Sequence, residues 1–389
     1  MNWVEAEVDL ALSRATTDKP NPLLFIPVLA AESAGSKALP AFAKRYQGVR
    51  DPLGDGKELA KLLKAVLKAD WDKSIRLIDE PFVGLRSMRE EEADRFFGRD
   101  AEVEELVEKF RRRRIVAIVA DSGTGKSSLA EAGFVPAFRG GALADPARSE
   151  PDDRVWHVVS MRPGTNPEEG LRTAVSEAAQ KLGRSVNVQS DLRKLVDIVT
   201  RSETAFALQC DLPTKKTATV LIVDQFEELL TQTPGALAAP FVKLLLALAN
   251  GDKDVRILLT VRADYFNLVS AIADAAGEPV KGAGGKTLFE RLAADGRSAI
   301  LPLKRISDDG LGEAVCKPLR LAGDTDEGAQ AALVKAVRRD ISDQPSDLPL
   351  LQVALRAAWR EHKATGLGLN AAYDSVGGVP GLRILVNLT

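Results

Sequence analysis

Two closely spaced glycines, a lysine and a serine mark the part of the chain that could do chemistry. Residues 120–127 read Ala-Asp-Ser-Gly-Thr-Gly-Lys-Ser and directly follow an apolar run at residues 115–119. The glycines let successive backbone N–H groups turn toward one point, and a helix that starts at the end of this segment would add its positive dipole end. Because such a loop binds phosphate oxygens, the segment predicts a site for a nucleoside triphosphate.

Each polar side chain of the loop has an expected role. Lys126 would reach the β- and γ-phosphates as a point charge, and the Ser127 hydroxyl would occupy one coordination position of Mg²⁺. Ala120 stands at the first position, where glycine is usual, which is a mild departure from the strict pattern. The expected phosphate contacts come from Ser122, Gly123, Thr124, Gly125, Lys126, Ser127 and Ser128.

A carboxylate at the end of a second apolar run completes the expected metal site. Residues 219–223 are apolar or β-branched, as in a buried parallel strand, and Asp224 follows them. Asp224 is placed to hold Mg²⁺ through water. Glu227 and Glu228 come next, and one of them could orient or activate the water that attacks the γ-phosphate, with Glu228 favoured. Alternatively, the two glutamates only open a helix, where acids stabilise the positive dipole end.

A third apolar run, at residues 255–261, ends in Arg262, with Asp264 close behind. An arginine at a strand tip beside a triphosphate can recognise the γ-phosphate, because its guanidinium matches phosphate oxygens and stays charged. The alternative role of Arg262 is that of a structural ion-pair partner.

The surrounding pattern supplies the elements that would position these residues. A helix before the first strand would bury Val103, Leu106, Val107 and Phe110. Residues 156–161 predict an additional strand, followed by Arg162-Pro-Gly-Thr, for which the sequence indicates no partner. Beyond residue 302 helices take over. Their apolar faces are formed by Leu333, Val334, Val337 and Ile341, and by Leu351, Ala354, Leu355 and Ala358.

Five phrases in a fixed order resemble one family. They are FFGRD, SGTGKSSLAEAGFVPAFR, VDQFEEL, TVRADYF and LPLLQVAL. Together they resemble the novel STAND NTPase family of bacterial conflict systems, part of the signal-transducing branch of the AAA-like P-loop superfamily. The resemblance covers roughly residues 81–380.

This resemblance implies further nucleotide contacts. By similarity, the residues that border the adenine and ribose are Phe97, Gly98, Arg99 and Pro349, and Arg262 takes the sensor position. Pro349 belongs to a Leu-Pro-Leu segment at residues 348–350 that resembles the GLPL element of the family. Asp347 stands in place of the glycine of that element, so the geometry at this corner is open.

The resemblance also implies a switch. Members of this class typically hold ADP in a closed form, exchange it for ATP when a sensor domain is triggered, and oligomerise. We therefore expect an ATP-hydrolysing signal-transduction switch in bacterial defence or conflict signalling, with ATP/ADP and Mg²⁺ as cofactors and self-association on activation. Two alternatives stay open. One is a scaffold that keeps ADP bound without hydrolysis, and the other is an ordinary enzyme, either a phosphotransferase or a TIR-type NAD-cleaving enzyme in the intact parent protein.

Composition restricts the expected partners. The chain has 389 residues, 45% of them hydrophobic, and a formal net charge of −2. This near balance gives no electrostatic footprint for nucleic acid or an anionic membrane, so neither is an expected partner. The apolar stretch at residues 23–31 is far shorter than the roughly 20 residues that a bilayer requires. The two cysteines, Cys210 and Cys316, fit reduced thiols in the cytoplasm.

These observations predict an α/β fold with several parts: a P-loop NTPase with a parallel sheet flanked by helices, a helical lid domain, the start of a truncated winged helix, and a partial TIR-like α/β unit in front. The expected boundaries are residues 1–73 for the TIR-like unit, 74–95 for a linker, 96–300 for the core, 301–378 for the lid and 379–389 for the winged-helix start. The first unit resembles the carboxyl-terminal half of a TIR domain, where the acid at Glu7 is catalytic in NAD-cleaving members. We expect the rest of that domain, and the sensor and effector domains, outside this chain.

Overall fold

The computed structural model of the chain describes eight stretches of sequence. They are residues 79–140, 142–143, 155–181, 217–250, 255–282, 284–293, 299–341 and 347–387. The predicted TIR-like unit, with Glu7, lies outside these stretches. Every helix in these stretches is too short or too polar to span a bilayer.

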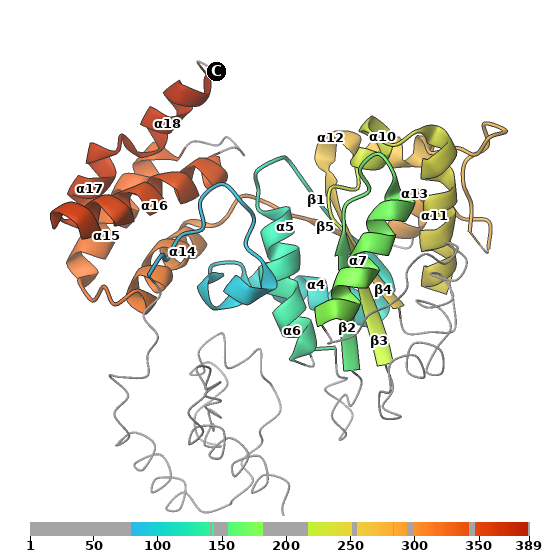
Figure 1. Ribbon diagram of the computed structural model, residues 1–389, viewed down its shortest axis with the longest axis horizontal. Helices are drawn as coiled ribbons and strands as arrows, with labels where there is room; N and C mark the ends of the chain where they lie inside the picture. The colour runs from blue at the N-terminus through green and yellow to red at the C-terminus, as the bar shows by residue number, and fades with distance from the viewer. Residues whose placement is uncertain are drawn as a thin grey trace, which may run out of the picture. The chain divides into compact units, whose positions relative to one another are not determined.

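Five parallel strands form the central sheet (Figure 1). In spatial order they are β2 Val155–Met161, β3 Thr217–Val223, β4 Val255–Arg262, β1 Ile115–Ala120 and β5 Ile300–Pro302. Runs rich in Val, Ile and Leu form the long strands, because such side chains suit a sheet that is covered on both faces. The predicted parallel α/β fold is confirmed. β5 gives no signal in the sequence because its three residues are too few to establish a period.

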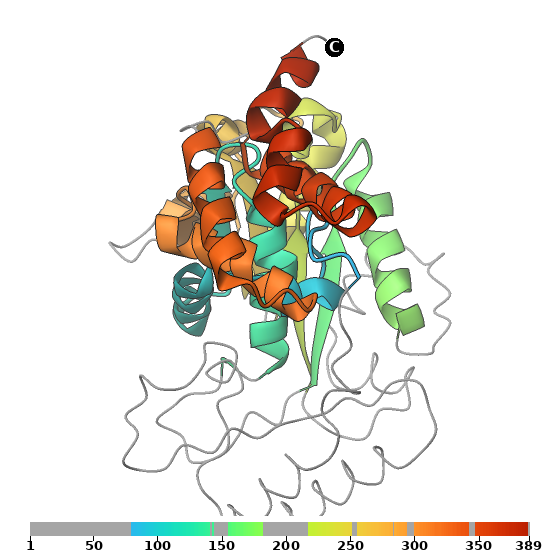
Figure 2. The same cartoon turned by 90° about the vertical axis from the view of Figure 1, so that its left-hand side faces the viewer.

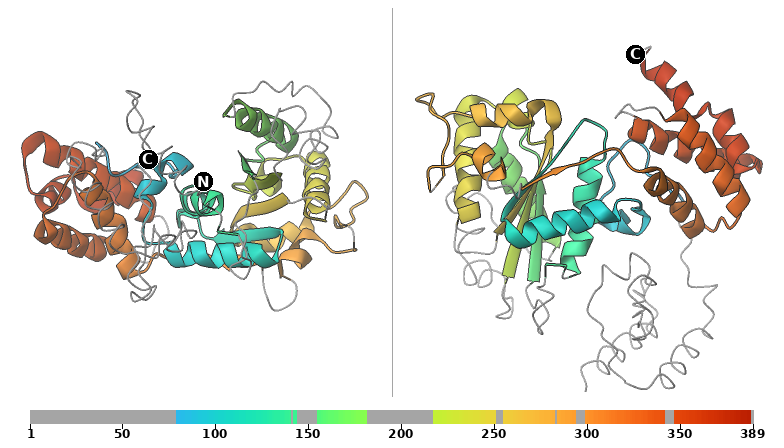
Figure 3. Two further views of the ribbon diagram at one scale, coloured as in Figure 1. Left: turned by 90° about the horizontal axis from the view of Figure 1, so that it is seen from below. Right: turned by 180° about the vertical axis from the view of Figure 1, so that it is seen from behind.

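Helices cover both faces of this sheet. The apolar core on one face is shared with α7 Pro167–Lys181, α11 Gly235–Asn250 and α13 Leu288–Ala293. Helix α4, Asp100–Arg112, lies on the side of the sheet opposite α7 (Figure 3). Its buried side chains are the four that the helical spacing predicts: Val103, Leu106, Val107 and Phe110. The strands are therefore held between two layers of helices.

One helical run follows the glycine-rich loop and packs against α4. It consists of α5 Lys126–Ser128, the π-helical segment η4 Leu129–Phe134 and α6 Val135–Arg139. Phe134 of this run stacks on Phe110 with 4.9 Å between ring centroids. A Cβ at Gly133 would lie 2.8 Å from the Phe96 ring and 2.9 Å from Val103. The close packing of the run on α4 therefore requires glycine at this position.

The C-terminal part of the chain is helical and has its own core (Figure 2). It contains α14 Asp308–Leu321, α15 Glu327–Asp340, α16 Asp347–Thr365, α17 Leu369–Ser375 and α18 Gly378–Asn387. Ser307 and Asp326 cap the first two helices by accepting hydrogen bonds from the backbone N–H groups of Gly310 and Ala329. The predicted apolar faces lie in this core: Leu333, Val337, Ile341, Leu351, Ala354, Leu355 and Ala358 are buried.

The described part of the segment that we expect to be a linker, residues 79–95, is packed against these helices. Phe82 is buried in the C-terminal core. Glu80 forms ion pairs with Arg356 and Arg360 of α16, and the indole N–H of Trp359 donates to the Asp79 carbonyl at 2.8 Å. Residues 90–95 form a short 3-10 helix, η3 Glu90–Arg95. Residues 79–82 of this segment are therefore held against the C-terminal helices by packing, ion pairs and a hydrogen bond.

Two glycines bring the segment before α4 into direct backbone contact with α14. Gly98 has a φ of 82°, which favours glycine, and a Cβ there would lie 2.1 Å from the carbonyl oxygen of Gly310. A Cβ at Gly310 would in turn lie 2.4 Å from the carbonyl oxygen of Gly98. Neither position therefore has room for a side chain.

We expect Gly310→Ala to lower the free energy of unfolding by about 2 kcal/mol or more, since the new methyl group would collide with backbone. Gly312→Ala on the same helix is the matched control, because its Cβ would meet nothing closer than 3.8 Å. Helix propensity favours alanine there by up to about 1 kcal/mol. Urea denaturation monitored by circular dichroism would compare the two variants, and equal effects would contradict the close approach.

Candidate functional site

The strand tips bring together the residues that the sequence singles out. β1 ends at Ala120 and leads into the loop, β3 ends one residue before Asp224, and Arg262 is the last residue of β4. Ala120 pairs with Arg262 in the register of the sheet. Because the strands are parallel, their carboxyl ends share one edge, where ligands bind in open α/β sheets.

The loop has the backbone that phosphate binding requires. Gly123 and Gly125 have φ values of 82° and 93°. The N–H groups of residues 122–125 donate no hydrogen bond within the described part of the chain, so they are open to the oxygens of a ligand. Thr124 turns its hydroxyl back to the carbonyl of Asp121, at 2.9 Å, which closes the turn. The geometry of the loop therefore fits an anion.

The side chain of Lys126 lies inside the curve of this loop. Lys126 is 8% exposed, and its Nζ donates to the carbonyl oxygens of Ala120 at 3.0 Å and Asp121 at 2.7 Å. Burial lowers the pKa of Lys126, and the nearby carboxylates of Glu227 and Asp224 act in the opposite direction. A bound phosphate would add further negative charge and would favour the ammonium form.

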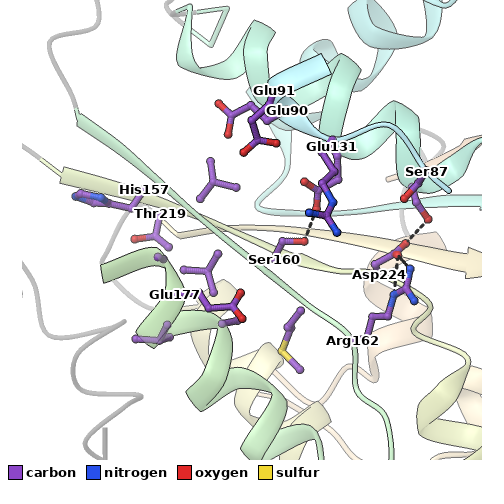
Figure 4. Close-up of a pocket in the computed structure, with 18 of the residues that line it drawn as sticks. Ser87, Glu90, Glu91, Glu131, His157, Ser160, Arg162, Glu177, Thr219 and Asp224 are labelled. Atoms are coloured by element: carbon purple, nitrogen blue, oxygen red, sulfur yellow. Dashed lines mark hydrogen bonds and ion pairs between the residues drawn. The ribbon is translucent and has the colours of Figure 1, made fainter. Parts of the chain in front are cut away.

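The carboxylate of Asp224 accepts four hydrogen bonds, two at each oxygen. Its Oδ1 accepts from the hydroxyls of Ser127 at 2.7 Å and Thr260 at 2.6 Å. Its Oδ2 accepts from Nε and Nη2 of Arg162 at 3.2 and 3.1 Å, as Figure 4 shows. The Ser127 contact joins two residues that lie 97 positions apart in the sequence. The predicted pair of metal-binding residues is therefore in direct contact.

A strained turn after β3 aims Asp224 at the loop. Gln225 has a φ of 54°, a left-handed conformation that is uncommon for residues other than glycine. Its N–H donates to the Thr260 hydroxyl at 2.9 Å, and the N–H of Phe226 donates to the Thr260 carbonyl, also at 2.9 Å. The Phe226 side chain is completely buried. Thr260 and the core thus hold the turn in place.

The two glutamates after this turn have different partners. Glu227 is buried, and its Oε2 accepts from the backbone N–H of Arg262 at 3.2 Å. Burial raises the pKa of Glu227, and the charge of Lys126 acts against this shift. Glu228 is the first residue of α10 Glu228–Thr231, and its Oε2 accepts from the N–H of Gly164 at 2.8 Å. Of the two carboxylates, Glu227 is the one that is bonded to the tip of β4 and whose charge raises the pKa of Lys126 against the effect of burial.

The guanidinium of Arg262 pairs with its own neighbour. Nε and Nη2 of Arg262 donate to the carboxylate of Asp264 at 3.1 and 2.7 Å. The guanidinium also lies 5.2 Å from the ring centroid of Tyr265, in α12 Ala263–Phe266. The structural ion pair that the sequence leaves open is therefore formed, while recognition of the γ-phosphate stays a prediction.

The segment around Arg99 contacts both the loop and the C-terminal part. Arg99 is buried, and its guanidinium donates to the carbonyl oxygens of Thr124 at 3.3 Å and Lys304 at 2.9 Å. The half-buried ring of Phe97 lies 5.2 Å from Nζ of Lys317, in α14. The expected contacts of this segment with adenine and ribose stay predictions.

The residue that replaces the glycine of the GLPL element has a structural partner. Asp347 is 1% exposed and receives two hydrogen bonds from Arg383 of α18, at 2.9 and 2.7 Å. It is the first residue of α16, and Pro349 follows in the first turn, where proline is tolerated. Within the described residues no hydrogen bond joins this turn to the loop, and the adenine contact of Pro349 stays a prediction.

A cleft of about 590 Å³ lies beside Ser127 and Asp224 (Figure 4). Ser127, Asp224 and Arg162 line one end of it, and His157 and Glu177 lie at the other end. Lys126 and the loop glycines are not part of its lining. The cleft therefore adjoins the glycine-rich loop on the side of β2 and is distinct from the space inside the loop.

Two residues of the site, Thr260 and Arg162, gave no signal as Asp224 partners in the sequence. Thr260 is the one polar residue in the stretch of β4 from Ile257 to Val261, and it is completely buried. Arg162 directly follows β2, a strand that the sequence does predict. A lone threonine within the apolar run Ile257–Val261 is the sequence feature that could have directed attention to Thr260, but it does not name Asp224 as the partner.

The fold and the loop define the class of protein. A parallel sheet with a glycine-rich loop after β1, and with Ser127 of that loop bonded to an aspartate at the tip of β3, is the arrangement of a P-loop NTPase. A family model described as Novel STAND NTPase 1 matches residues 81–382. The chain belongs to this family, as the five phrases predict.

Comparisons with curated proteins and with solved structures give weaker similarities than the family model does. No curated protein matches the chain. Of the 42 chains of solved structures that match it, three serve as examples. The Walker-type ATPase PABY2304 of Pyrococcus abyssi has 15% identity over 78% of this chain and 77% of that chain, with a TM-score of 0.45. The ORC2 protein of Aeropyrum pernix in ADPNP-ADP complexes has 12% identity over 71% of this chain and 67% of that chain, with a TM-score of 0.46. Drosophila ORC bound to DNA has 12% identity over 96% of this chain and 73% of that chain, with a TM-score of 0.40. Likenesses at this level decide nothing about the ligands of this chain.

The burial of Glu227 predicts a pH-dependent effect on stability. A carboxyl group whose pKa is raised by folding binds its proton more tightly in the native state, so its ionisation costs stability as the pH rises from its ordinary pKa of 4.5. We expect Glu227→Gln to raise the Tm at pH 7.5 and to lose this advantage as the pH falls toward 4.5. Glu104→Gln, on the exposed side of α4, removes the same charge at the surface and serves as the control. A lower Tm for Glu227→Gln at pH 7.5 would show that the attraction between the Glu227 carboxylate and the charge of Lys126 outweighs the cost of burial.

Proposed function

We propose that the chain binds and slowly hydrolyses ATP at this site and acts as a nucleotide-dependent switch. The observation that carries the proposal is the hydrogen bond of 2.7 Å between the Ser127 hydroxyl and the Asp224 carboxylate. It joins the loop after β1 to the tip of β3 and sets a hydroxyl and a carboxylate side by side. Oxygen donors of this kind are the ligands that Mg²⁺ prefers, directly or through water, so the residues fit that ion.

The phosphates would be bound by groups that lie open in the loop. The N–H groups of residues 122–125 would donate to phosphate oxygens, and Lys126 would exchange its carbonyl partners for the β- and γ-phosphates. The Ser127 hydroxyl can present an oxygen lone pair to the metal while its O–H continues to donate a hydrogen bond to Asp224. When bound, Mg²⁺ would neutralise charge on the phosphate oxygens.

Water would be oriented by Glu227 in this proposal. The charge of Glu227 acts on Lys126, and the Glu227 carboxylate accepts a hydrogen bond from the backbone N–H of Arg262. The Glu228 carboxylate accepts instead from the backbone N–H of Gly164. A general base must be within reach of the water that attacks the γ-phosphate, and that phosphate would lie near Lys126. The geometry therefore favours Glu227 over Glu228, the reverse of the preference from the sequence.

The switch would operate through the segment around Arg99, since this residue bonds to the loop at Thr124 and to the backbone at Lys304. Moving a two-state equilibrium from 1:99 to 99:1 takes about 5.5 kcal/mol of differential binding. Contacts of Lys126, Asp224 and Arg262 with the γ-phosphate and its metal in only one conformation would supply a large part of it. Adenine would lie against Phe97, Gly98 and Pro349.

The wider role follows from the family. We propose that the switch serves bacterial defence signalling in the cytoplasm, and that ATP binding promotes self-association of the chain. Nucleotide is the expected ligand, and neither nucleic acid nor membrane is an expected partner, because a net charge of −2 leaves the chain as a whole without an excess of positive charge.

Removing the ammonium of Lys126 tests the binding step. We expect Lys126→Ala to weaken ATP binding by about 100-fold or more, because a charge-assisted contact with the phosphates is lost. Isothermal titration calorimetry in the presence of Mg²⁺ measures this change. Lys335→Ala, at an exposed position of α15, is the control and should bind as the wild type does. Unchanged affinity of the Lys126 variant would refute the site.

Single-turnover hydrolysis tests the assignment of the base. Glu227→Gln should bind ATP and hydrolyse it about 100-fold more slowly, the size of effect typical of a lost general base. Glu228→Gln should retain most of the activity. The opposite order would restore Glu228 as the base. A wild-type chain that retains ADP without any turnover would favour the non-hydrolysing scaffold.

A further inference from the structure

The contact between Arg162 and Asp224 occupies the part of the carboxylate that a hydrated metal would need. Oδ1 of Asp224 already accepts from Ser127 and Thr260, two hydroxyls fixed on neighbouring elements. Oδ2 is the oxygen that remains, and the guanidinium of Arg162 donates to it twice. A water ligand of the metal that donates to Oδ2 would compete with these two hydrogen bonds.

The two partners differ in how freely they can move. The Asp224 side chain is 10% exposed, whereas the Arg162 side chain is 53% exposed. The backbone beyond Arg162 is anchored, since Gly164 donates to Glu228 and accepts from the Thr233 hydroxyl. The guanidinium can therefore leave Asp224 by side-chain rotation, without movement of the strand.

In the absence of metal, the positive charge of Arg162 stabilises the negative charge of Asp224. A nearly buried carboxylate without a compensating charge is costly, and a guanidinium that donates two hydrogen bonds offsets that cost. The divalent cation offers more charge at the same place. The guanidinium of Arg162 and a hydrated metal ion would each compensate the charge of Asp224 at the same oxygen, Oδ2. Binding of one therefore competes with binding of the other.

We propose that Arg162 is an internal counter-cation that holds Asp224 when the metal is absent and releases Oδ2 when a metal-nucleotide complex binds. The inference rests on the proposed function, because it concerns the metal site of the same loop. Arg162 is on this account a positioning residue: it holds Asp224 aligned with Ser127, and it sets the metal concentration at which the site loads.

Metal binding in the presence of ATP tests this proposal without any measurement of turnover. Mn²⁺ binding to the full chain, followed by electron paramagnetic resonance, gives the half-saturating free Mn²⁺ concentration. We expect Arg162→Ala to lower this concentration by about 3- to 5-fold, the range for a partly exposed ion pair. The variant should also have a lower Tm than the wild type in EDTA and regain more of it on addition of Mn²⁺ and ATP.

Arg139→Ala is the matched control, since Arg139 lines the same cleft but pairs with Glu90. It should leave the Mn²⁺ concentration unchanged. Arg162→Lys keeps the charge but loses the paired hydrogen bonds, so its half-saturating Mn²⁺ concentration should lie between those of the wild type and Arg162→Ala. If Arg162→Ala does not fold, the comparison of Arg162→Lys with the wild type tests the proposal.

Each contrary outcome has a distinct meaning. An unchanged Mn²⁺ concentration in the Arg162 variants would overturn the proposal and leave Arg162 a structural partner of Asp224. A higher concentration, or loss of ATP binding in EDTA, would overturn it in favour of a direct contact between Arg162 and the phosphates. If the wild type itself binds no ATP, the proposed function fails and this inference fails with it, whereas normal wild-type binding with no effect of Arg162 removes this inference alone.

Discussion

The carboxylate of Asp224 is the constraint on which the site depends. A nearly buried acid at a strand tip is stable only if its oxygens are satisfied, and here two hydroxyls and a guanidinium satisfy them. Through these contacts, Asp224 ties the loop after β1, the strand β4 and the end of β2 to the tip of β3. One carboxylate therefore sets the relative positions of four strand tips, and with them the place of any phosphate and metal.

The rest of the fold supports this arrangement by packing. The left-handed Gln225 lets the chain turn sharply after Asp224, and the burial of Phe226 together with the Thr260 contacts offsets the strain of that turn. On the other side of the loop, Arg99 links Thr124 to the backbone at Lys304, and the contact between Gly98 and Gly310 brings α14 close. Nucleotide-dependent changes in the loop thus have a short, hydrogen-bonded path to the C-terminal helices.

Features that are local in sequence were predictable, and long-range partners were not. The loop, the four long strands and the apolar faces of α4, α15 and α16 follow from period and glycine spacing, and the family match follows from the five phrases. Arg162 and Thr260 gave no such signal, because their importance comes from a partner on another strand. The different orientations of Glu227 and Glu228 depend on the turn at Gln225, which no local pattern indicates. The TIR-like unit lies outside the described residues and stays a prediction.

The position of the metal tests the central claim most directly. Crystals of the chain grown with Mn²⁺ and a non-hydrolysable ATP analogue would give an anomalous signal for the ion. The account predicts one peak within coordination distance of the Ser127 hydroxyl, about 2.0–2.3 Å, with Asp224 reached through a bound water. A nucleotide bound with its metal away from Ser127 and Asp224, or a loop that holds no phosphate at all, would contradict it.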